Sequence, residues 1–233
     1  MAEFTNGYKC LDCKHCFKKS PLFSLLKKDE LDALNEARME VSFKKGEIIY
    51  KQGTPLTHIV IINEGLGKIY LEGSKGRNLI LSYAKQYELN GGVGVFIDKR
   101  HHSSLMAVTD CSACFVEIAA FKEVLRSNPI FMEAYLKVYS ERILHTYKQF
   151  SVLTQKNMEG RMAESIIYLT NQVFMNGEIK NVSKQDLAEI TAMTKESAIR
   201  VLKEFKDDGI IEIVDQKISI LNQKALEQVA AHG

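Results

Sequence analysis

SKQDLAEITAMTKESAIRVLKEFK, residues 183–206, predicts two short helices joined by a tight turn. Ser183 is placed to cap the first helix, because its hydroxyl can accept a hydrogen bond from a free backbone N–H. Asp186, three residues later, completes a capping box. Thr194 is placed to cap the second helix, and Glu196 lies in its first turn, where the helix dipole favours negative charge. The pattern therefore defines where both helices begin.

The second helix has one apolar and one polar face. Apolar residues at spacings of three and four predict a buried stripe made of Ala198, Val201, Leu202 and Phe205. The other face carries Lys195, Glu196, Ile199, Arg200 and Lys203. This layout is typical of a recognition helix in the DNA major groove, where arginine suits guanine and glutamate suits the cytosine amino group. An ordinary helix pair with a solvated charged face has the same pattern.

The residues after the second helix favour DNA binding over an ordinary helix pair. Gly209 follows the helix, as glycine often does at a helix C-terminus. Two β-type runs, Ile210–Ile213 and Lys217–Leu221, then flank Asp215 and Gln216. They predict a two-stranded wing beside the helix pair.

A family resemblance becomes specific at residues 194–211, TKESAIRVLKEFKDDGII. This run resembles the recognition helix and turn of the CRP/FNR transcription regulators. Glu196, Arg200, Leu202 and Gly209 match the family's motif. The ending ISILNQKAL also resembles the family, and the similarity extends over most of the chain.

The resemblance implies roles for the exposed residues of this helix. It implies that Glu196 and Arg200 read bases, and that Lys195 and Ser197 contact phosphates or serve as auxiliary base contacts. Ile199 stands where family members often carry a small or polar residue. Ile199 is therefore a further candidate contact, and the half-site sequence cannot be carried over from the family.

The composition sets bounds on the class of protein. Of 233 residues, 45% are apolar and 26% are charged, which is ordinary for a globular chain of one or two domains. The net charge of +2 is too small to indicate DNA binding, so that function must come from local arrangement. We expect a cytoplasmic protein, because no apolar run reaches the length of a membrane span and no signal core is present. We expect no enzyme, because motifs such as G-x-S-x-G and H-E-x-x-H are absent from the sequence.

Three of the five cysteines are closely spaced near the N-terminus. Cys10, Cys13 and Cys16 form C-x-x-C-x-x-C, a spacing that lets thiolates converge on one centre, as in zinc and iron–sulfur sites. Neighbouring lysines favour the thiolate form. A fourth ligand is needed, and the remaining cysteines are Cys111 and Cys114.

The FNR branch of the family suggests which cysteine completes the set. In that branch an N-terminal cysteine trio and one sensor-domain cysteine hold a [4Fe–4S] cluster, although the family's last N-terminal gap is longer than the one here. Strand alternation puts Cys114 on the face of Val116 and Cys111 on the other face. We expect Cys114 to be the fourth ligand. A zinc site, a thiol–disulfide switch and thiols without a role remain alternatives.

From Val41 to about Ile118 the pattern changes from helix to strand. Short β-type runs alternate with glycines, which predicts a barrel or jelly roll. Residues 44–65, KKGEIIYKQGTPLTHIVIINEG, resemble the cyclic-nucleotide-binding domain. The glycines suit tight turns and do not indicate that a nucleotide binds.

The candidate effector pocket departs from the members that bind cyclic AMP. Those members carry a glutamate in a G-E-x-G phrase for the ribose and an arginine before serine for the phosphate. Here Gly92 replaces the glutamate, Val93 follows, and His102 precedes Ser103. A phosphate needs a cation or several N–H donors, so we do not expect cyclic AMP to bind. Binding of another small anion remains an alternative. His101 and His102 could instead ligate haem or a metal, or the segment could be a polar loop without a ligand.

Pro129 is predicted to open a long helix that runs to about Asn157. Its apolar residues approximate a heptad seam made of Met132, Leu136, Tyr139, Ile143, Tyr147 and Phe150. We expect this seam to pair with a second copy of the chain, while Phe131, Tyr135 and Val138 pack on the chain's own barrel. Such a homodimer would read a palindromic operator in double-stranded DNA.

We therefore predict an α+β protein with a cyclic-nucleotide-binding-like β jelly roll, a long dimerisation helix and a C-terminal winged helix-turn-helix. The expected segments are a Cys-rich segment (1–20), a sensor domain (21–128), the dimerisation helix (129–157) and the DNA-binding domain (158–233). The predicted function is a DNA-binding transcription regulator that responds to oxygen, redox state or a small effector, with RNA polymerase as a partner. The competing hypothesis is a metal- or redox-binding protein whose DNA-binding half is vestigial.

Overall fold

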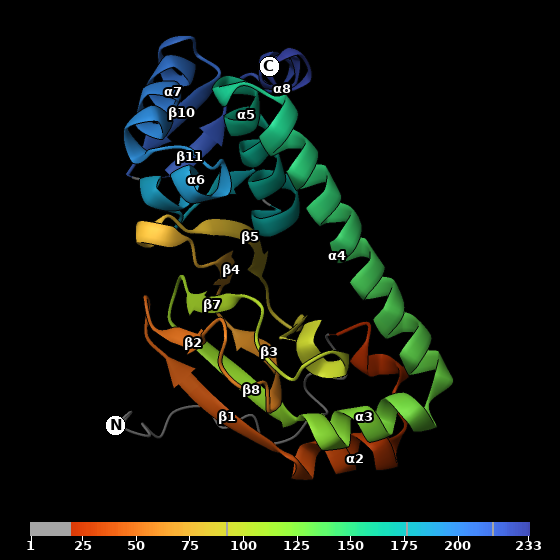
Figure 1. Cartoon of the computed structure of the whole chain (residues 1–233). Coiled ribbons are helices and arrows are strands. Elements are labelled where there is room, and N and C mark those ends of the chain that lie inside the picture. Colours follow the sequence, from red (N-terminus) through yellow and green to blue (C-terminus); the bar gives the residue numbers. More distant parts are fainter. Residues whose placement is uncertain (1–19, 92, 176, 216) are drawn as a thin grey trace. The chain divides into compact units, whose positions relative to one another are not determined.

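The computed structural model describes residues 20–91, 93–175, 177–215 and 217–233. The chain divides into two compact units (Figure 1). The first contains the described residues up to Leu71 together with Tyr83–Ile143, and the second contains Glu72–Ser82 and Leu144–Gly233. The division falls inside the longest helix, α4 (Pro129–Gln155).

Antiparallel strands form most of the first unit. In the described residues they make two four-stranded sheets, ordered β1-β8-β3-β6 and β2-β7-β4-β5. The strands are β1 (Arg38–Phe43), β2 (Ile48–Tyr50), β3 (His58–Glu64), β4 (Gly67–Leu71), β5 (Leu79–Ala84), β6 (Leu89–Asn90), β7 (Ser104–Ala107) and β8 (Cys111–Glu117). Short helical segments accompany them: η1 (Phe23–Leu25), α2 (Lys28–Glu36), η3 (Val93–Phe96) and α3 (Ile118–Ser127). This is the predicted jelly-roll type of domain. The short helix η2 (Ser74–Gly76) and most of β5 fall within Glu72–Ser82, which belongs to the second unit.

Strand β3 shows why the central strands are continuously apolar. Ile59 and Ile61 belong to a core formed with α2, α3 and the start of α4, whereas Val60 and Ile62 belong to a second core with residues of β2 and β7. Both faces of β3 are therefore covered, and a strand buried on two sides needs no polar alternation. The helices α2 and α3 pack against each other and against β8 (Figure 1).

The second unit is a winged helix-turn-helix. It contains α5 (Met158–Tyr168), the π-helical segment η4 (Leu169–Phe174), α6 (Lys184–Ile190), α7 (Lys195–Asp207) and α8 (Gln223–His232). Its strands are β9 (Glu178–Ile179), β10 (Ile211–Val214) and β11 (Lys217–Ile220), in the order β10-β11-β9. The hairpin of β10 and β11 is the predicted wing.

The predicted helix caps of the second unit are present. The Ser183 hydroxyl accepts the Asp186 N–H at 3.0 Å, and the Ser183 N–H donates to the Asp186 carboxylate at 2.8 Å. The Thr194 hydroxyl accepts the Ser197 N–H at 3.2 Å. Gly209 has a φ of +67°, which glycine adopts without strain, and so ends α7 as expected.

Helix α4 carries two kinds of apolar face. Phe131 and Tyr135 are buried in the core of the first unit. Met132 and Tyr139, which the heptad pattern assigned to the seam, also pack against that core. The rest of the seam is exposed in the single chain: Leu136, Ile143, Tyr147 and Phe150 are 47–69% exposed. Among the described residues, no helix combines the length and apolar character that crossing a membrane requires.

Candidate nucleic-acid interface and sensor sites

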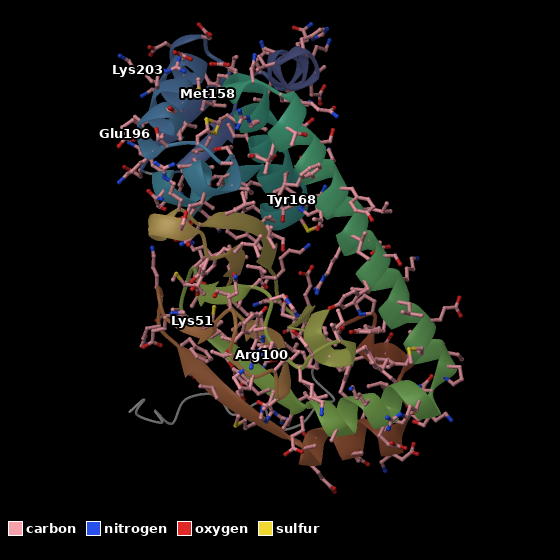
Figure 2. The ribbon with its side chains drawn as sticks, viewed as in Figure 1. Lys51, Arg100, Met158, Tyr168, Glu196 and Lys203 are labelled. Carbon is pink, nitrogen blue, oxygen red and sulfur yellow. The ribbon has the colours of Figure 1, made fainter. Side chains whose placement is uncertain are left out.

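Helix α7 buries its predicted stripe and presents its polar face. Ala198, Val201, Leu202 and Phe205 are at most 3% exposed, and α7 packs on α5 and α6 within the second unit. The opposite side carries the predicted contacts: Lys195, Glu196, Ile199 and Arg200 are exposed and Ser197 is half-buried. Figure 2 shows Glu196 and Lys203 on the outer side of α7. The arrangement leaves the N-terminal half of this helix open to a large ligand.

Glu196 is held as a charged hydrogen-bond acceptor. Its own backbone N–H and the Thr194 hydroxyl both stabilise the carboxylate and hold the pKa of Glu196 below its usual value. An exposed carboxylate in the first turn of a helix can accept a hydrogen bond from the amino group of cytosine.

Arg200 already has partners in the DNA-free chain. Its Nη1 lies 2.7 Å from Glu204 Oε1, and its Nη2 lies 3.8 Å from Glu159 Oε1 and 4.0 Å from the sulfur of Met158. Met158 and Glu159 form the first turn of α5. The guanidinium of Arg200 therefore lies near the first turn of α5. The residue spacing within α7 could not predict this contact.

The histidine and serine of the predicted effector pocket have separate partners. His102 is exposed, and its Nε2 lies 3.0 Å from Asp98 Oδ1. Ser103 hydrogen-bonds the Tyr50 hydroxyl. Gly92 lies outside the described residues, as does the side chain of Val93. At the position where cyclic-AMP-binding members carry an arginine, this chain has His102, whose ring is paired with Asp98.

His101 is the buried histidine of the pair. It is 8% exposed, and its ring stacks on Tyr50 with centroids 4.1 Å apart. Its Nδ1 has no hydrogen-bond partner among the described residues. Burial lowers the pKa of His101 to about 4, so the ring is neutral at physiological pH.

The two sensor-domain cysteines lie in different cores, as strand alternation predicts. Cys114 belongs to the same core as Val116 and as Leu22 and Phe23, which precede α2, whereas Cys111 belongs to the other core. Arg38 Nη1 lies 3.9 Å from Cys114 Sγ. A guanidinium beside a sulfur favours the thiolate, which is the form that binds metal.

Cys111 is held as a thiol. Its Sγ donates to the carbonyls of Thr109 at 3.2 Å and Leu66 at 3.4 Å. Burial is the main reason that the pKa of Cys111 is raised. Cys10, Cys13 and Cys16 lie outside the described residues. Within the part of the chain that the structure covers, no group of three or more His, Cys, Asp or Glu side chains is arranged to hold a metal ion.

Comparison with known proteins agrees with this architecture. Residues 40–128 match the family model of the cyclic nucleotide-binding domain, and residues 160–229 match that of the Crp-like helix-turn-helix domain. The chain is similar to FixK2 from Bradyrhizobium japonicum, with a TM-score of 0.76 and 19% identity over 84% of this chain and 98% of that one. It is also similar to the c-di-GMP responsive regulator CLP of Xanthomonas campestris, with a TM-score of 0.73 and 20% identity over 83% of this chain and 99% of that one. These likenesses establish the fold.

Curated relatives match over nearly the whole chain. Electron transport regulator A of Shewanella oneidensis is 25% identical over 88% of this chain and 83% of its own length. The fumarate and nitrate reduction regulatory protein of Escherichia coli is 25% identical over 88% of this chain and 82% of its own length. The CRP-like cAMP-activated global transcriptional regulator of Mycobacterium tuberculosis is 20% identical over 91% of this chain and 97% of its own length. Since both family models match this chain and curated transcription regulators match over most of it, the chain belongs to the CRP/FNR family of DNA-binding transcription regulators.

Proposed function

We propose that this regulator binds a palindromic operator as a homodimer and reads bases with Glu196 and Arg200. In this proposal Lys195 and Ser197 contact phosphates or serve as auxiliary base contacts, and Ile199 makes an apolar base contact, for example with a thymine methyl. The observation that carries the proposal is the capped N-terminus of α7, whose polar face is exposed while its apolar face is buried. Residues 158–233 serve as the DNA-binding domain.

The dimer forms through α4 in this proposal, with residues 129–157 as the dimerisation helix. Leu136, Ile143, Tyr147 and Phe150 form an apolar stripe that a single chain leaves exposed. Burying such a stripe against its own copy is favourable by roughly 25 cal/mol per Å² of apolar surface. A two-fold dimer then presents two recognition helices to successive turns of duplex.

The proposed sensor is the first part of the chain, with residues 1–20 as a Cys-rich segment and 21–128 as the sensor domain. The candidate ligands of an iron–sulfur cluster are Cys10, Cys13, Cys16 and Cys114, as in the FNR branch. Three residues separate Cys16 from Ser20 in the sequence. Leu22, six residues after Cys16 in the sequence, belongs to the same buried core as Cys114.

The residues around Cys114 suit a thiolate ligand. Arg38 Nη1 lies 3.9 Å from its sulfur, and a cation at this place would favour negative charge on the sulfur. A cluster would supply redox and oxygen sensitivity, in keeping with relatives named for electron transport and for fumarate and nitrate reduction. Zinc and a thiol–disulfide switch use the same sulfurs and are the competing assignments.

Cyclic AMP is not the proposed effector, although one relative is named as cAMP-activated. His102 stands at the position of the phosphate-binding arginine and is engaged by Asp98. Signal binding would shift the population of dimers toward one arrangement of the DNA-binding domains, which then recruits or blocks RNA polymerase in the cytoplasm.

Selection from a random duplex library tests the DNA-binding proposal. The expected result is an enriched palindrome with half-sites one helical turn apart. Enrichment of no sequence, with intact metal binding, would favour the competing function, a metal- or redox-binding protein with a vestigial DNA-binding domain.

Anaerobic purification with iron, zinc and visible-absorption analysis tests the sensor. Iron with a broad visible band is expected, and Cys114→Ala should lose it while Cys111→Ala, the matched control, keeps it. Equal iron content in the two variants would contradict the assignment of Cys114.

A further inference from the structure

A cavity of about 80 Å³ lies in the second unit, between the end of α4, α5 and the π-helical segment η4. One water takes about 10–15 Å³ of such space, so the cavity holds several waters or one compact organic molecule. The proposed DNA contacts and sensor residues contribute none of its walls. Tyr168, labelled in Figure 2, lines it from the end of α5.

Two polar side chains of the cavity are held in place by the backbone of β5. Gln149 Nε2 donates to the Ile80 carbonyl at 2.7 Å, and His145 hydrogen-bonds the backbone of Leu81. The His145 ring also lies against the Tyr168 ring, with centroids 4.8 Å apart. A ligand would therefore meet side chains whose orientation is already fixed, which lowers the entropy lost on binding.

The cavity is lined by one carboxylate, Glu164, and one ammonium group, Lys148, and Glu164 has a second cationic partner, Lys156, outside the lining. Glu164 pairs with Lys156 at 2.8 Å and with Lys148 at 3.3 Å. Burial alone would raise the pKa of Glu164, but the two lysines outweigh burial and hold that pKa below its usual value. Burial lowers the pKa of His145, so its ring is neutral. Two ammonium groups thus face a single carboxylate.

Lys148 is the cation that can exchange its partner. Its side chain is 65% exposed, whereas that of Lys156 is 21% exposed and also donates to the Ala230 carbonyl. A ligand carboxylate could pair with Lys148 while Glu164 stays with Lys156. Charge-assisted hydrogen bonds of this kind are about twice as strong as neutral ones.

The floor of the cavity is apolar. It is formed by Val152, Leu153, Ile167 and Ile190. One wall is the π-helical segment η4, and π-helical turns are frequent at functional sites. On α4 the cavity residue Val152 lies about 140° around the helix from Tyr147 and about 160° from Phe150, because residues are spaced about 100° apart around a helix. A dimer formed through the exposed stripe would leave the cavity open.

We propose that this cavity binds a small organic monocarboxylate, with its carboxylate on Lys148 and a compact apolar body on the floor. The ligand would act as an effector, because α5 packs on α7 and an occupant between α4 and α5 changes how α7 is presented. Binding to the cavity does not depend on the proposed DNA contacts.

Isothermal titration calorimetry of the full chain with benzoate tests the proposal, with benzamide as the uncharged ligand of the same shape. Saturable binding of one benzoate per chain is expected, and none of benzamide. Lys148→Met should weaken binding at least tenfold, whereas Lys137→Met, an exposed lysine elsewhere on α4, should leave it unchanged. Leu153→Trp, which fills the floor, should abolish it.

Two results would overturn the proposal: benzoate that does not saturate, or equal benzoate binding by wild type and Lys148→Met. The second readout is operator affinity, which benzoate should change at least threefold in wild type and not in Leu153→Trp. Because calorimetry is done without DNA, a protein that binds benzoate but no operator would contradict the proposed function alone.

Discussion

Arg200 has acidic partners within the chain that are weaker than the base contact proposed for it. Its ion pairs with Glu204 and Glu159 are solvent-exposed, and such pairs contribute about 0.2–1 kcal/mol. A bidentate contact to guanine discriminates by about 1–3 kcal/mol, so the base can displace the carboxylate. In the proposed role of Arg200, the two acidic residues would compete with DNA for its guanidinium without preventing binding.

Glu159→Gln should tighten operator binding, by up to about fivefold, because the competing charge is removed. Fluorescence anisotropy at fixed salt measures the effect, and Glu227→Gln on α8 is the matched control. In an Arg200→Gln background the same substitution should change nothing. A gain of the same size in that background would show a general charge effect and contradict the role of the ion pair.

His101 makes stability depend on pH. Its folded-state pKa of about 4 lies below the value of about 6.5 for a solvated histidine. Between these values the unfolded chain binds a proton that the folded chain does not, so this contribution is complete above about pH 6.5 and is lost as the pH falls toward 4. Between pH 7 and pH 5, the Tm of the His101→Phe variant should therefore fall by less than the Tm of wild type. An identical decline in both proteins would exclude His101 as a source of the acid sensitivity.

At the residue scale, the sequence predicted those features that depend only on residues nearby in the chain. The caps Ser183 and Thr194 and the two faces of α7 follow from side-chain spacing and hydrogen-bonding capacity. The pairing of Arg200 with Glu159 joins two helices that are distant in sequence, so spacing within α7 could not predict it.

At the scale of elements, Lys156 joins three helices of the second unit. It lies just beyond α4, and its side chain binds Glu164 on α5 and the Ala230 carbonyl on α8. Arg161 Nε donates to the Lys156 carbonyl at 3.0 Å and Arg161 Nη1 to the Thr191 carbonyl at 3.4 Å, which adds the end of α6. The junction between α4 and α5 is thus tied to the helix-turn-helix.

Lys156→Met should lower the free energy of unfolding by about 1–3 kcal/mol, because it leaves half-buried polar groups with fewer partners. Lys148→Met removes the more exposed partner of the same carboxylate and should cost less than about 1 kcal/mol. Urea unfolding of both variants measures the difference. Equal losses would mean that the junction is not held by Lys156.

Elements were predicted well where one periodicity dominates and poorly where two compete. The strands, the wing and the long helix follow from periods of two and of 3.6 residues. The π-helical turn at Leu169–Phe174 has a helix-like apolar pattern, and such a pattern does not distinguish a π-helical turn from an α-helix. Met132 and Tyr139 fit both a heptad seam and the core of the first unit, and in the structure they pack against that core.

At the scale of the whole molecule, reading both halves of a palindrome requires two copies of the chain. Phe150→Glu puts a charge into the exposed apolar stripe of α4, so it should leave the single chain folded and prevent the dimer. Sedimentation analysis should show a monomer with lost affinity for the palindrome. Lys137→Glu, also exposed on α4, should remain dimeric. If the Phe150→Glu variant is still dimeric, the dimer interface does not include this stripe.

The central claim is that Arg200 on α7 reads bases, and it is tested by the ratio of affinities for the selected palindrome and for scrambled DNA. Wild type and Lys206→Ala, an exposed control on the same helix, should show the same ratio. Arg200→Ala should lower the ratio at least about tenfold, because one base contact of about 1–3 kcal/mol is lost in each half-site. An unchanged ratio in Arg200→Ala would contradict the account.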